Sequence, residues 1–193
     1  MEAKQRKHYY IPFIPEAKID YLYLFELMGQ ATYSPSTKAY DTISYQSVAK
    51  LAEKLSFSKS TLDRILTAEK YLPFLTVDKA QKQIKLHNSF MRGTEKRPFV
   101  CLTDVEVSFL RENDDNLLCK YLIYMKYYCG KTQNKDQDFT AKQFLTACGY
   151  STNSQSQLDT VSNYNSLLET AGFISITKYR DSLGNIRNKY TYT

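Results

Sequence analysis

The sequence has few of the glycines and histidines that nucleotide-binding and catalytic motifs require. Its six glycines never come close enough together to form a G-x-G-x-x-G or P-loop pattern, which excludes nucleotide binding by those routes. Neither of its two histidines lies near a cysteine, serine or acidic motif that would indicate a catalytic triad. We therefore expect a protein that is not an enzyme and that uses no cofactor.

Long apolar runs and tryptophan are absent as well. No window reaches the roughly 18 uninterrupted apolar residues that a membrane helix needs, and the first residues lack the apolar region of a signal peptide. We therefore expect no membrane partner and a cytoplasmic location. The 17 tyrosines are the one compositional excess, and we expect them in the core, at an interface or in a ligand platform.

The four cysteines, Cys101, Cys119, Cys129 and Cys148, form no C-x-x-C pair. Paired cysteines or added histidines at short spacing are needed for a zinc site, so no metal site is expected. Three of the four occupy apolar-face positions of predicted helices. Buried, reduced thiols are the better interpretation.

Positive charge is concentrated in the first half of the chain. The whole sequence has a formal net charge of +6, from 26 basic and 20 acidic residues. Residues 1–100 hold 16 basic and 10 acidic residues, whereas residues 101–193 hold 10 of each. A basic protein prefers polyanions, so nucleic acid is the first partner to consider.

Apolar spacing predicts a similar order of elements in both halves of the chain. The order is helix, helix, turn, helix and β-hairpin, and a polar segment with Gly and Pro separates the halves. We therefore predict domains at 1–90, with a basic N-terminal arm, and at 99–193, joined by a linker at 91–98. In the first half the helices are expected around 19–28, 48–55 and 62–69, with Ser44 as N-cap of the second, and the strands at 74–77 and 84–86. In the second half the helices are expected around 118–129, 141–148 and 158–168, with a capping box at Thr140 and Gln143, and the strands at 173–179 and 186–192.

Two segments carry a resemblance to known proteins. Residues 56–66 (SFSKSTLDRIL) are similar to the turn and recognition helix of many bacterial DNA-binding proteins, and residues 167–174 (LLETAGFI) are similar to a recognition helix that runs into a wing. The chain thus resembles tandem winged-helix proteins, such as replication initiators of plasmids and phages and regulators of mobile elements. The resemblance implies an α+β fold, mainly α, with two tandem winged helix-turn-helix domains, each with three helices plus a β-hairpin wing.

Given that resemblance, small polar and basic side chains opposite the apolar face of a recognition helix are candidate DNA contacts. The alternative is a solvated amphipathic face, and Asp63 and Glu69 weaken the electrostatic case. The candidates in the first half are Lys59, Ser60, Thr61, Arg64 and Lys70 on the helix and Lys79 and Lys82 on the wing.

The second half offers hydrogen-bonding side chains on its third helix and basic side chains on its wing. The helix has no positive charge, so it would read base edges while the wing holds phosphate. The alternative is a polar face that contacts only water or a partner subunit. The candidates are Ser156, Gln157, Thr160 and Asn163 on the helix and Lys178, Arg180, Arg187 and Lys189 on the wing.

The resemblance implies sequence-specific binding of double-stranded DNA, in replication initiation or maintenance of a plasmid, phage or mobile element. One alternative is a transcriptional regulator that binds a palindrome as a homodimer. Another is a winged-helix module for protein–protein interaction. The partners expected are double-stranded DNA, a second copy of the chain in the palindrome alternative, and a replicative helicase or other replication protein in the initiator alternative.

Overall fold

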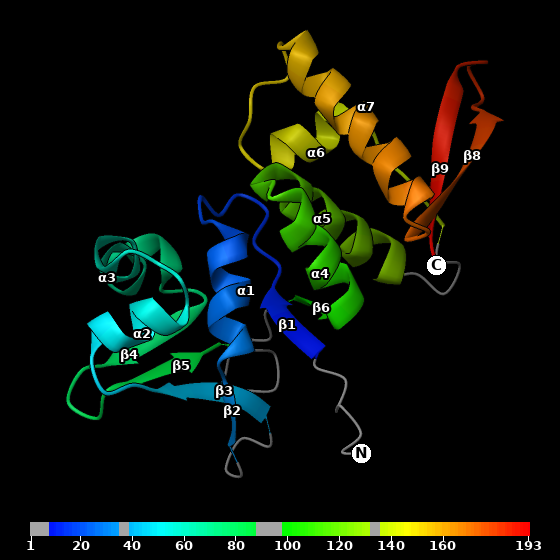
Figure 1. Ribbon diagram of the computed structural model, residues 1–193. Coiled ribbons are helices and arrows are strands. Elements are labelled where there is room, and N and C mark those ends of the chain that lie inside the picture. The colour runs from blue at the N-terminus through cyan, green and yellow to red at the C-terminus, as the bar shows by residue number, and fades with distance from the viewer. Residues whose placement is uncertain (1–7, 35–38, 88–97, 132–135) are drawn as a thin grey trace. The chain divides into compact units, whose positions relative to one another are not determined.

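The computed structural model describes residues 8–34, 39–87, 98–131 and 136–193 (Figure 1). The chain forms two compact units. The first unit comprises the chain up to Phe13 together with Lys18–Asp114, and the second comprises Ile14–Ala17 and Asp115–Thr193. The predicted basic arm and all of the predicted linker except Pro98 lie outside the described residues. The division between the units falls between Asp114 and Asp115, about 20 residues beyond the position predicted from the sequence.

One part of the first unit joins the start of the chain to residues far along it. Strand β1 (His8–Pro12) pairs antiparallel with β6 (Phe99–Thr103), and Tyr10 lies opposite Cys101. Helix α4 (Asp104–Asn113) follows β6 at once, because Thr103 and Glu106 form a capping box that satisfies the first free backbone N–H groups. In helix α1 (Tyr21–Gly29) Glu26 pairs with Arg111 of α4, with 2.6 Å between Oε1 and Nε.

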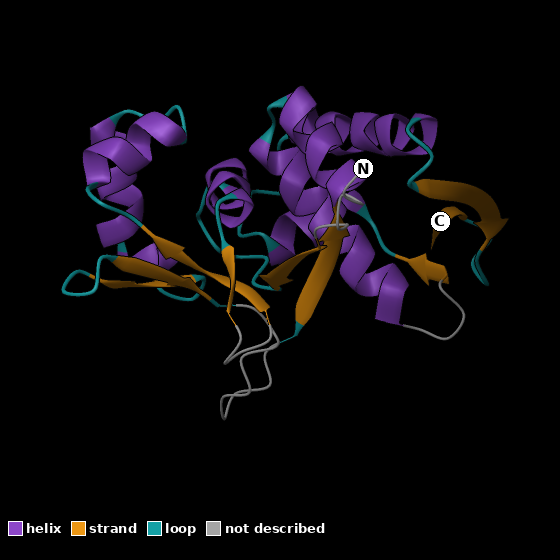
Figure 2. Ribbon diagram, turned by 60° about the horizontal axis from the view of Figure 1, so that its bottom comes forward, coloured by secondary structure: helices purple, strands orange, loops and turns teal. Residues whose placement is uncertain are grey.

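The other part of the first unit is a four-stranded sheet with two short helices. The strand order is β2-β3-β5-β4, and all neighbouring pairs are antiparallel. Helices α2 and α3 lie on one side of this sheet in Figure 2, and Leu51, Leu62, Ile65, Phe74 and Ile84 are buried in its core. The elements are β2 (Thr32–Ser34), β3 (Ala39–Ser44), α2 (Val48–Lys54), α3 (Lys59–Thr67), the 3-10 turn Glu69–Tyr71, β4 (Leu75–Asp78) and β5 (Gln83–Leu86).

The second unit packs two long helices and one short helix with a three-stranded sheet of order β7-β9-β8. Its core is strongly aromatic. The ring of Phe144 meets those of Tyr121 and Tyr124 edge-on, at centroid distances of 4.8 and 5.3 Å, and Phe139 stacks on Tyr190 at 4.8 Å. The elements are α5 (Asn116–Lys131), β7 (Asp136–Asp138), α6 (Ala141–Ala147), α7 (Gln155–Thr170), β8 (Ile174–Arg180) and β9 (Ile186–Tyr192).

The predicted tandem winged-helix fold is wrong. The described chain is a mixed structure with seven α-helices and three separate sheets of two, four and three strands. Strand β6 and helix α4, which the prediction placed in a second domain, belong to the first unit because β6 pairs with β1. The polar stretch after α1, which the prediction treated as a loop, forms strands β2 and β3. Because β3 pairs with β5, the predicted hairpin β4–β5 is part of a larger sheet and is not a separate wing.

Several local predictions are confirmed within this different architecture. The helices α1, α2, α3, α5, α6 and α7 and the hairpins β4–β5 and β8–β9 lie where apolar spacing placed them, within a few residues. Thr140 and Gln143 form the predicted capping box of α6. The predicted N-cap Ser44 is wrong: it ends strand β3, and Ser47 caps α2 by accepting a hydrogen bond from the backbone N–H of Lys50 at 3.2 Å.

Burial of the cysteines leads to a reactivity prediction. Cys119, Cys129 and Cys148 are buried as predicted, and Cys101 is partly exposed. Burial raises the pKa of the Cys148 thiol to about 11, which suppresses the nucleophilic thiolate. We expect a disulfide reagent at about pH 8 to titrate only Cys101 in the folded protein, and all four thiols in guanidinium chloride. Rapid reaction of a second thiol in the folded protein would argue against this core.

Candidate nucleic-acid interface

Helix α3 presents a basic, polar face opposite a buried apolar one. Leu62 and Ile65 are buried against the unit, whereas Lys59, Ser60 and Arg64 are exposed. The i, i+3 spacing of the two apolar residues fixes this orientation, because residues three apart share a helix face. Of the candidates on this element, Lys59 and Arg64 therefore present positive charge to solvent.

The hydroxyl groups at the start of α3 are engaged in capping. Ser58 accepts a hydrogen bond from the backbone N–H of Thr61 at 3.0 Å. Its hydroxyl also lies 2.8 Å from Oγ1 of Thr61 and 2.9 Å from Oγ of Ser60. Thr61 is only partly exposed. The hydroxyl groups of Ser60 and Thr61, both predicted as DNA contacts, thus lie within hydrogen-bond distance of the capping residue Ser58. Of the two, Ser60 is also exposed to solvent.

The turn between β4 and β5 adds exposed lysines to the same unit. Oδ1 of Asp78 accepts the backbone N–H of Gln81 at 2.9 Å, and the N–H of Tyr45 donates to the carbonyl oxygen of Lys82 at 3.0 Å. The first bond closes the turn, and the second ties it to Tyr45, the residue that follows β3. Lys79 and Lys82 are exposed within the turn.

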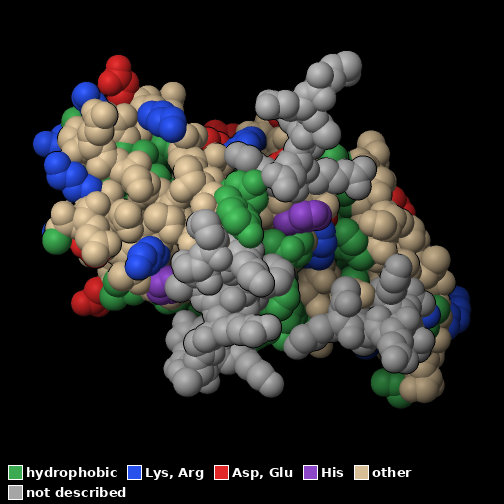
Figure 3. Space-filling model, turned by 90° about the horizontal axis from the view of Figure 1, so that it is seen from below, with side chains coloured by type: hydrophobic (Ala, Val, Ile, Leu, Met, Phe, Trp, Pro, Cys, Tyr) green, Lys and Arg blue, Asp and Glu red, His purple; other side chains and the backbone are tan. Residues whose placement is uncertain are grey.

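Charge in this region is positive overall. From α2 to the end of β5 the chain carries eight basic and four acidic residues. Helix α3 and the β4–β5 turn lie toward the same end of the first unit, at the left of Figure 1, and Figure 3 shows several Lys and Arg side chains at that end. We call Lys59, Arg64, Lys79 and Lys82 the basic surface. The candidate Lys70 is exposed nearby, with its Nζ 5.6 Å from the ring centroid of Tyr71.

Helix α7 offers less to a ligand than its sequence indicated. The Thr160 hydroxyl donates to the backbone carbonyl of Ser156 at 2.8 Å, so it is turned back onto its own helix. Gln157 is only partly exposed, and its Oε1 is buried without a hydrogen-bond partner among the described residues. Ser156 and Asn163 are exposed. Two of the four predicted contacts on α7 therefore face solvent.

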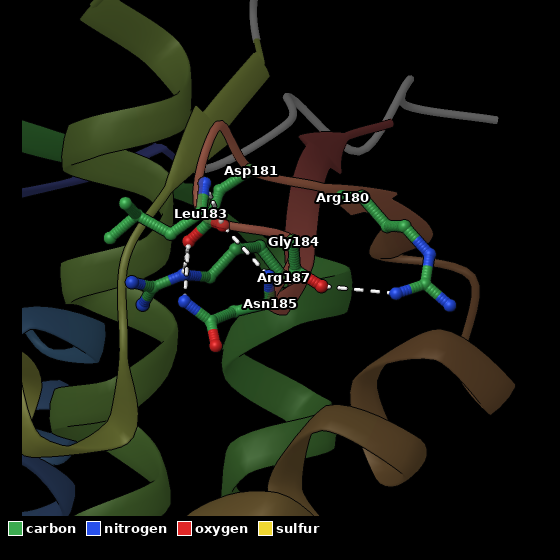
Figure 4. A network of polar contacts seen from close by, with 6 residues as sticks. All are labelled: Arg180, Asp181, Leu183, Gly184, Asn185 and Arg187. Atoms are coloured by element: carbon green, nitrogen blue, oxygen red, sulfur yellow. Dashed lines mark hydrogen bonds and ion pairs between the residues drawn. The ribbon is translucent and has the colours of Figure 1, made fainter.

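The β8–β9 hairpin distributes its basic residues unevenly. Lys178 and Arg180 are exposed, and Arg180 donates to the carbonyl oxygen of Gly184 at 3.0 Å. Arg187 is partly exposed and pairs through Nε with Oδ2 of Asp181 at 2.9 Å, as Figure 4 shows. Lys189 is partly exposed. The positive charge available at the tip therefore comes from Lys178 and Arg180.

Asp181 organises the turn of this hairpin. Its carboxylate accepts the backbone N–H groups of Leu183 at 3.0 Å and Asn185 at 2.8 Å in addition to the Arg187 bond (Figure 4). The Arg187 hydrogen bond, helped by the donors from Asn185 and Leu183, lowers the pKa of Asp181 to about 2. Hydrogen bonds that favour the charged form have this effect on a carboxyl group.

The lowered pKa predicts how the turn responds to acid. A carboxylate with a depressed pKa holds its bonds above its ordinary pKa and loses them as the pH falls through the folded value. We expect the backbone amide shifts of Leu183 and Asn185 to move with a midpoint near the pKa of about 2. NMR spectra of wild type and Asp181→Asn check this, since the variant lacks the transition. A midpoint at the ordinary value of 3.8 would contradict the network.

Two exposed apolar residues of the hairpin tip were missed by the sequence reasoning. Leu183 is 83% exposed and Ile186 is 65% exposed. The available signal was a leucine inside the polar turn Asp-Ser-Leu-Gly-Asn, which the turn prediction treated as part of the loop.

Among the described residues no group of three or more His, Cys, Asp or Glu side chains could hold a metal ion. No helix in the described ranges is long and apolar enough to cross a membrane.

Comparison of the chain with protein-family models, with curated proteins and with solved structures found no match. The function of these surfaces is therefore inferred from the residues of this chain.

Proposed function

We propose that the protein binds double-stranded DNA through its first unit, with α3 and the β4–β5 turn as the contacting elements. The observation that supports this most is the exposure of Lys59 and Arg64 on the outward face of α3, in the same unit as exposed Lys79 and Lys82. Lys and Arg side chains neutralise phosphates and release the counterions around them, which drives binding to DNA.

The dimensions of α3 suit a DNA groove. An α-helix with its side chains is about 10–12 Å in diameter, and this is the dimension that must fit the width of a groove. The major groove is about 12 Å wide and admits an α-helix. Ser60 and Asp63 are exposed on this helix beside the cations. A serine hydroxyl can donate to or accept from base edges, and a carboxylate can accept from the amino group of cytosine. These two side chains would supply a preference for particular bases, while the Lys and Arg side chains of the basic surface bind the phosphates of the DNA backbone.

Fluorescence anisotropy with a mixed-sequence duplex at several salt concentrations tests the proposal. Four phosphate contacts by the basic surface would make log affinity fall with log salt at a slope of about −3.6. An absence of binding at low salt would overturn the proposal. A slope near zero would do so as well, because it would show binding without phosphate contacts.

The same DNA binding would serve replication initiation or transcriptional regulation, and the arrangement of the target separates these roles. Selection of bound sequences from a random pool would give the site. Direct repeats favour an initiator, whereas a palindrome favours a regulator that binds as a homodimer.

A further inference from the structure

The paired strands β1 and β6 hold a cysteine and a histidine next to each other (Figure 1). The antiparallel register places Tyr10 opposite Cys101, so His8 is the diagonal neighbour of that cysteine on the same face of the pair. Nδ1 of His8 lies 3.6 Å from Sγ of Cys101, which is within hydrogen-bond distance for a sulfur atom. The two residues are 93 positions apart in the sequence. No short motif encodes such a pair, because the residues meet only through the pairing of β1 with β6.

Aromatic rings lie beside the thiol on this face. Side chains alternate along a strand, so His8 and Tyr10 share one face of β1, and Phe99 and Cys101 share the same face of β6. The ring of Tyr10 lies 6.0 Å from that of Phe99 and 6.3 Å from that of His8, centroid to centroid. Phe99 is exposed and Cys101 is partly exposed. The thiol therefore lies at the surface, where a small molecule can reach it.

The charged groups of the neighbouring helices lie toward the opposite face of the strand pair. Tyr9 is buried on that opposite face, since it adjoins Tyr10 in the strand. Asp104 and Arg111 of α4 interact with the Tyr9 hydroxyl. Glu26 of α1 pairs with Arg111. These groups therefore act on the buried side of the sheet.

Two titratable side chains lie beside the thiol itself, His8 and Tyr10. Burial, and after it the neighbouring Cys101, raises the pKa of the Tyr10 hydroxyl. A hydroxyl responds in this way to a neighbour that takes up negative charge. A thiol reacts as its thiolate, and an adjacent imidazole favours that form by taking up the proton. The geometry thus places a proton acceptor next to the one cysteine that is not buried.

Thiol–disulfide exchange is a reaction that this pair can carry out without a further reagent. The Cys101 proton passes to Nδ1 of His8, and the thiolate attacks one sulfur of a small disulfide. A new S–S bond forms, the S–S bond of the reagent breaks, and the second sulfur departs with the electron pair as a thiolate. That thiolate takes the proton from His8. Cys101 is oxidised to the mixed disulfide, and one half of the reagent is reduced to a thiol.

We propose that Cys101, positioned beside His8, is a site of reversible mixed-disulfide formation with low-molecular-weight disulfides. The other three cysteines are buried, so the exchange is confined to this thiol. The site lies on β1 and β6 and does not rest on the proposed DNA binding.

Reaction of the full protein with glutathione disulfide, followed over time by mass spectrometry, tests the proposal. We expect one adduct per chain, which dithiothreitol releases and which Cys101→Ser does not form. At pH 7 the wild type should react about threefold faster than His8→Gln, because a larger thiolate fraction is offset in part by the lower nucleophilicity of the stabilised thiolate. The wild-type rate should be half-maximal below about pH 8.5, the value for an ordinary thiol, and His8→Gln should return to that value.

His87→Gln is the matched control, because His87 follows β5 in the other sheet of the unit and its Nε2 lies 2.7 Å from Oγ1 of Thr76. Its rate and pH profile should equal those of the wild type. A purely structural role of His8 would leave the pH profile of His8→Gln unchanged, and that result would overturn the proposal. An adduct that persists in Cys101→Ser, or a wild type that forms none, would overturn it as well.

Discussion

Replacing Lys59 and Arg64 with glutamine will weaken binding to a mixed-sequence DNA duplex by about 30-fold at 0.15 M salt. Both side chains are exposed on the outward face of α3. By the counterion-release relation each neutralised phosphate contributes about a fivefold factor at this salt concentration, and two contacts multiply. The slope of log affinity against log salt should become shallower by about 1.8. Anisotropy titrations of the wild type and the Lys59→Gln/Arg64→Gln variant measure both quantities.

A charge-matched control separates local contacts from net charge. Lys18 and Lys142 are exposed and lie outside the basic surface and the β8–β9 hairpin. Lys18→Gln/Lys142→Gln lowers the net charge by the same two units, and we expect its affinity to stay within about threefold of wild type. Equal losses in the two double variants would show that only overall charge matters and would contradict a contact surface on α3.

Replacing Phe144 with alanine will destabilise the protein by about 3–5 kcal/mol. Phe144 is fully buried on α6, and its ring meets those of Tyr121 and Tyr124 edge-on. The substitution removes the ring and leaves a cavity that the surrounding aromatic residues fill only in part. Because domains of this size have a free energy of unfolding of about 5–15 kcal/mol, the loss is a large fraction of the total.

Urea unfolding followed by near-ultraviolet circular dichroism measures this loss, because the signal reports the packing of aromatic rings. Leu183→Ala is the control, since its side chain is 83% exposed. Its free energy of unfolding should stay within about 0.5 kcal/mol of wild type. If Phe144→Ala changed the midpoint no more than the control, the aromatic core of the second unit would be misplaced.

The helices could be predicted because their signals are local. The spacing of Leu62 and Ile65 on α3 and the Thr140–Gln143 capping box of α6 each fall within a single turn of helix, where sequence neighbours are also spatial neighbours. The pairing of β1 with β6 could not be predicted, since His8 and Thr103 are partners across most of the first half of the chain. Nothing in either short segment specifies the other. The repeated order of elements therefore suggested two equivalent domains, and this long-range pairing overturned them.

The candidate surface was predictable in part for the same reason. Exposure of Arg64 follows from helix periodicity, because this residue is turned away from buried Leu62 and Ile65, whereas Lys59 is exposed as the first residue of the helix. The Thr160 hydroxyl donates to a carbonyl of its own helix, and Arg187 pairs with Asp181. Both interactions depend on side-chain geometry, which the spacing of apolar residues does not encode. Exposure of Leu183 depends on the hydrogen bonds of its turn. Residue type alone would have placed that leucine in the core.

The most direct test of the central claim is a map of the amide shifts that a DNA duplex causes in the protein's NMR spectrum. If the first unit binds DNA as proposed, the largest changes will fall on residues 58–67, which include α3 and its cap, and on the turn at 78–82. Changes confined to β1, β6 and α4, or no changes in the first unit, would contradict it.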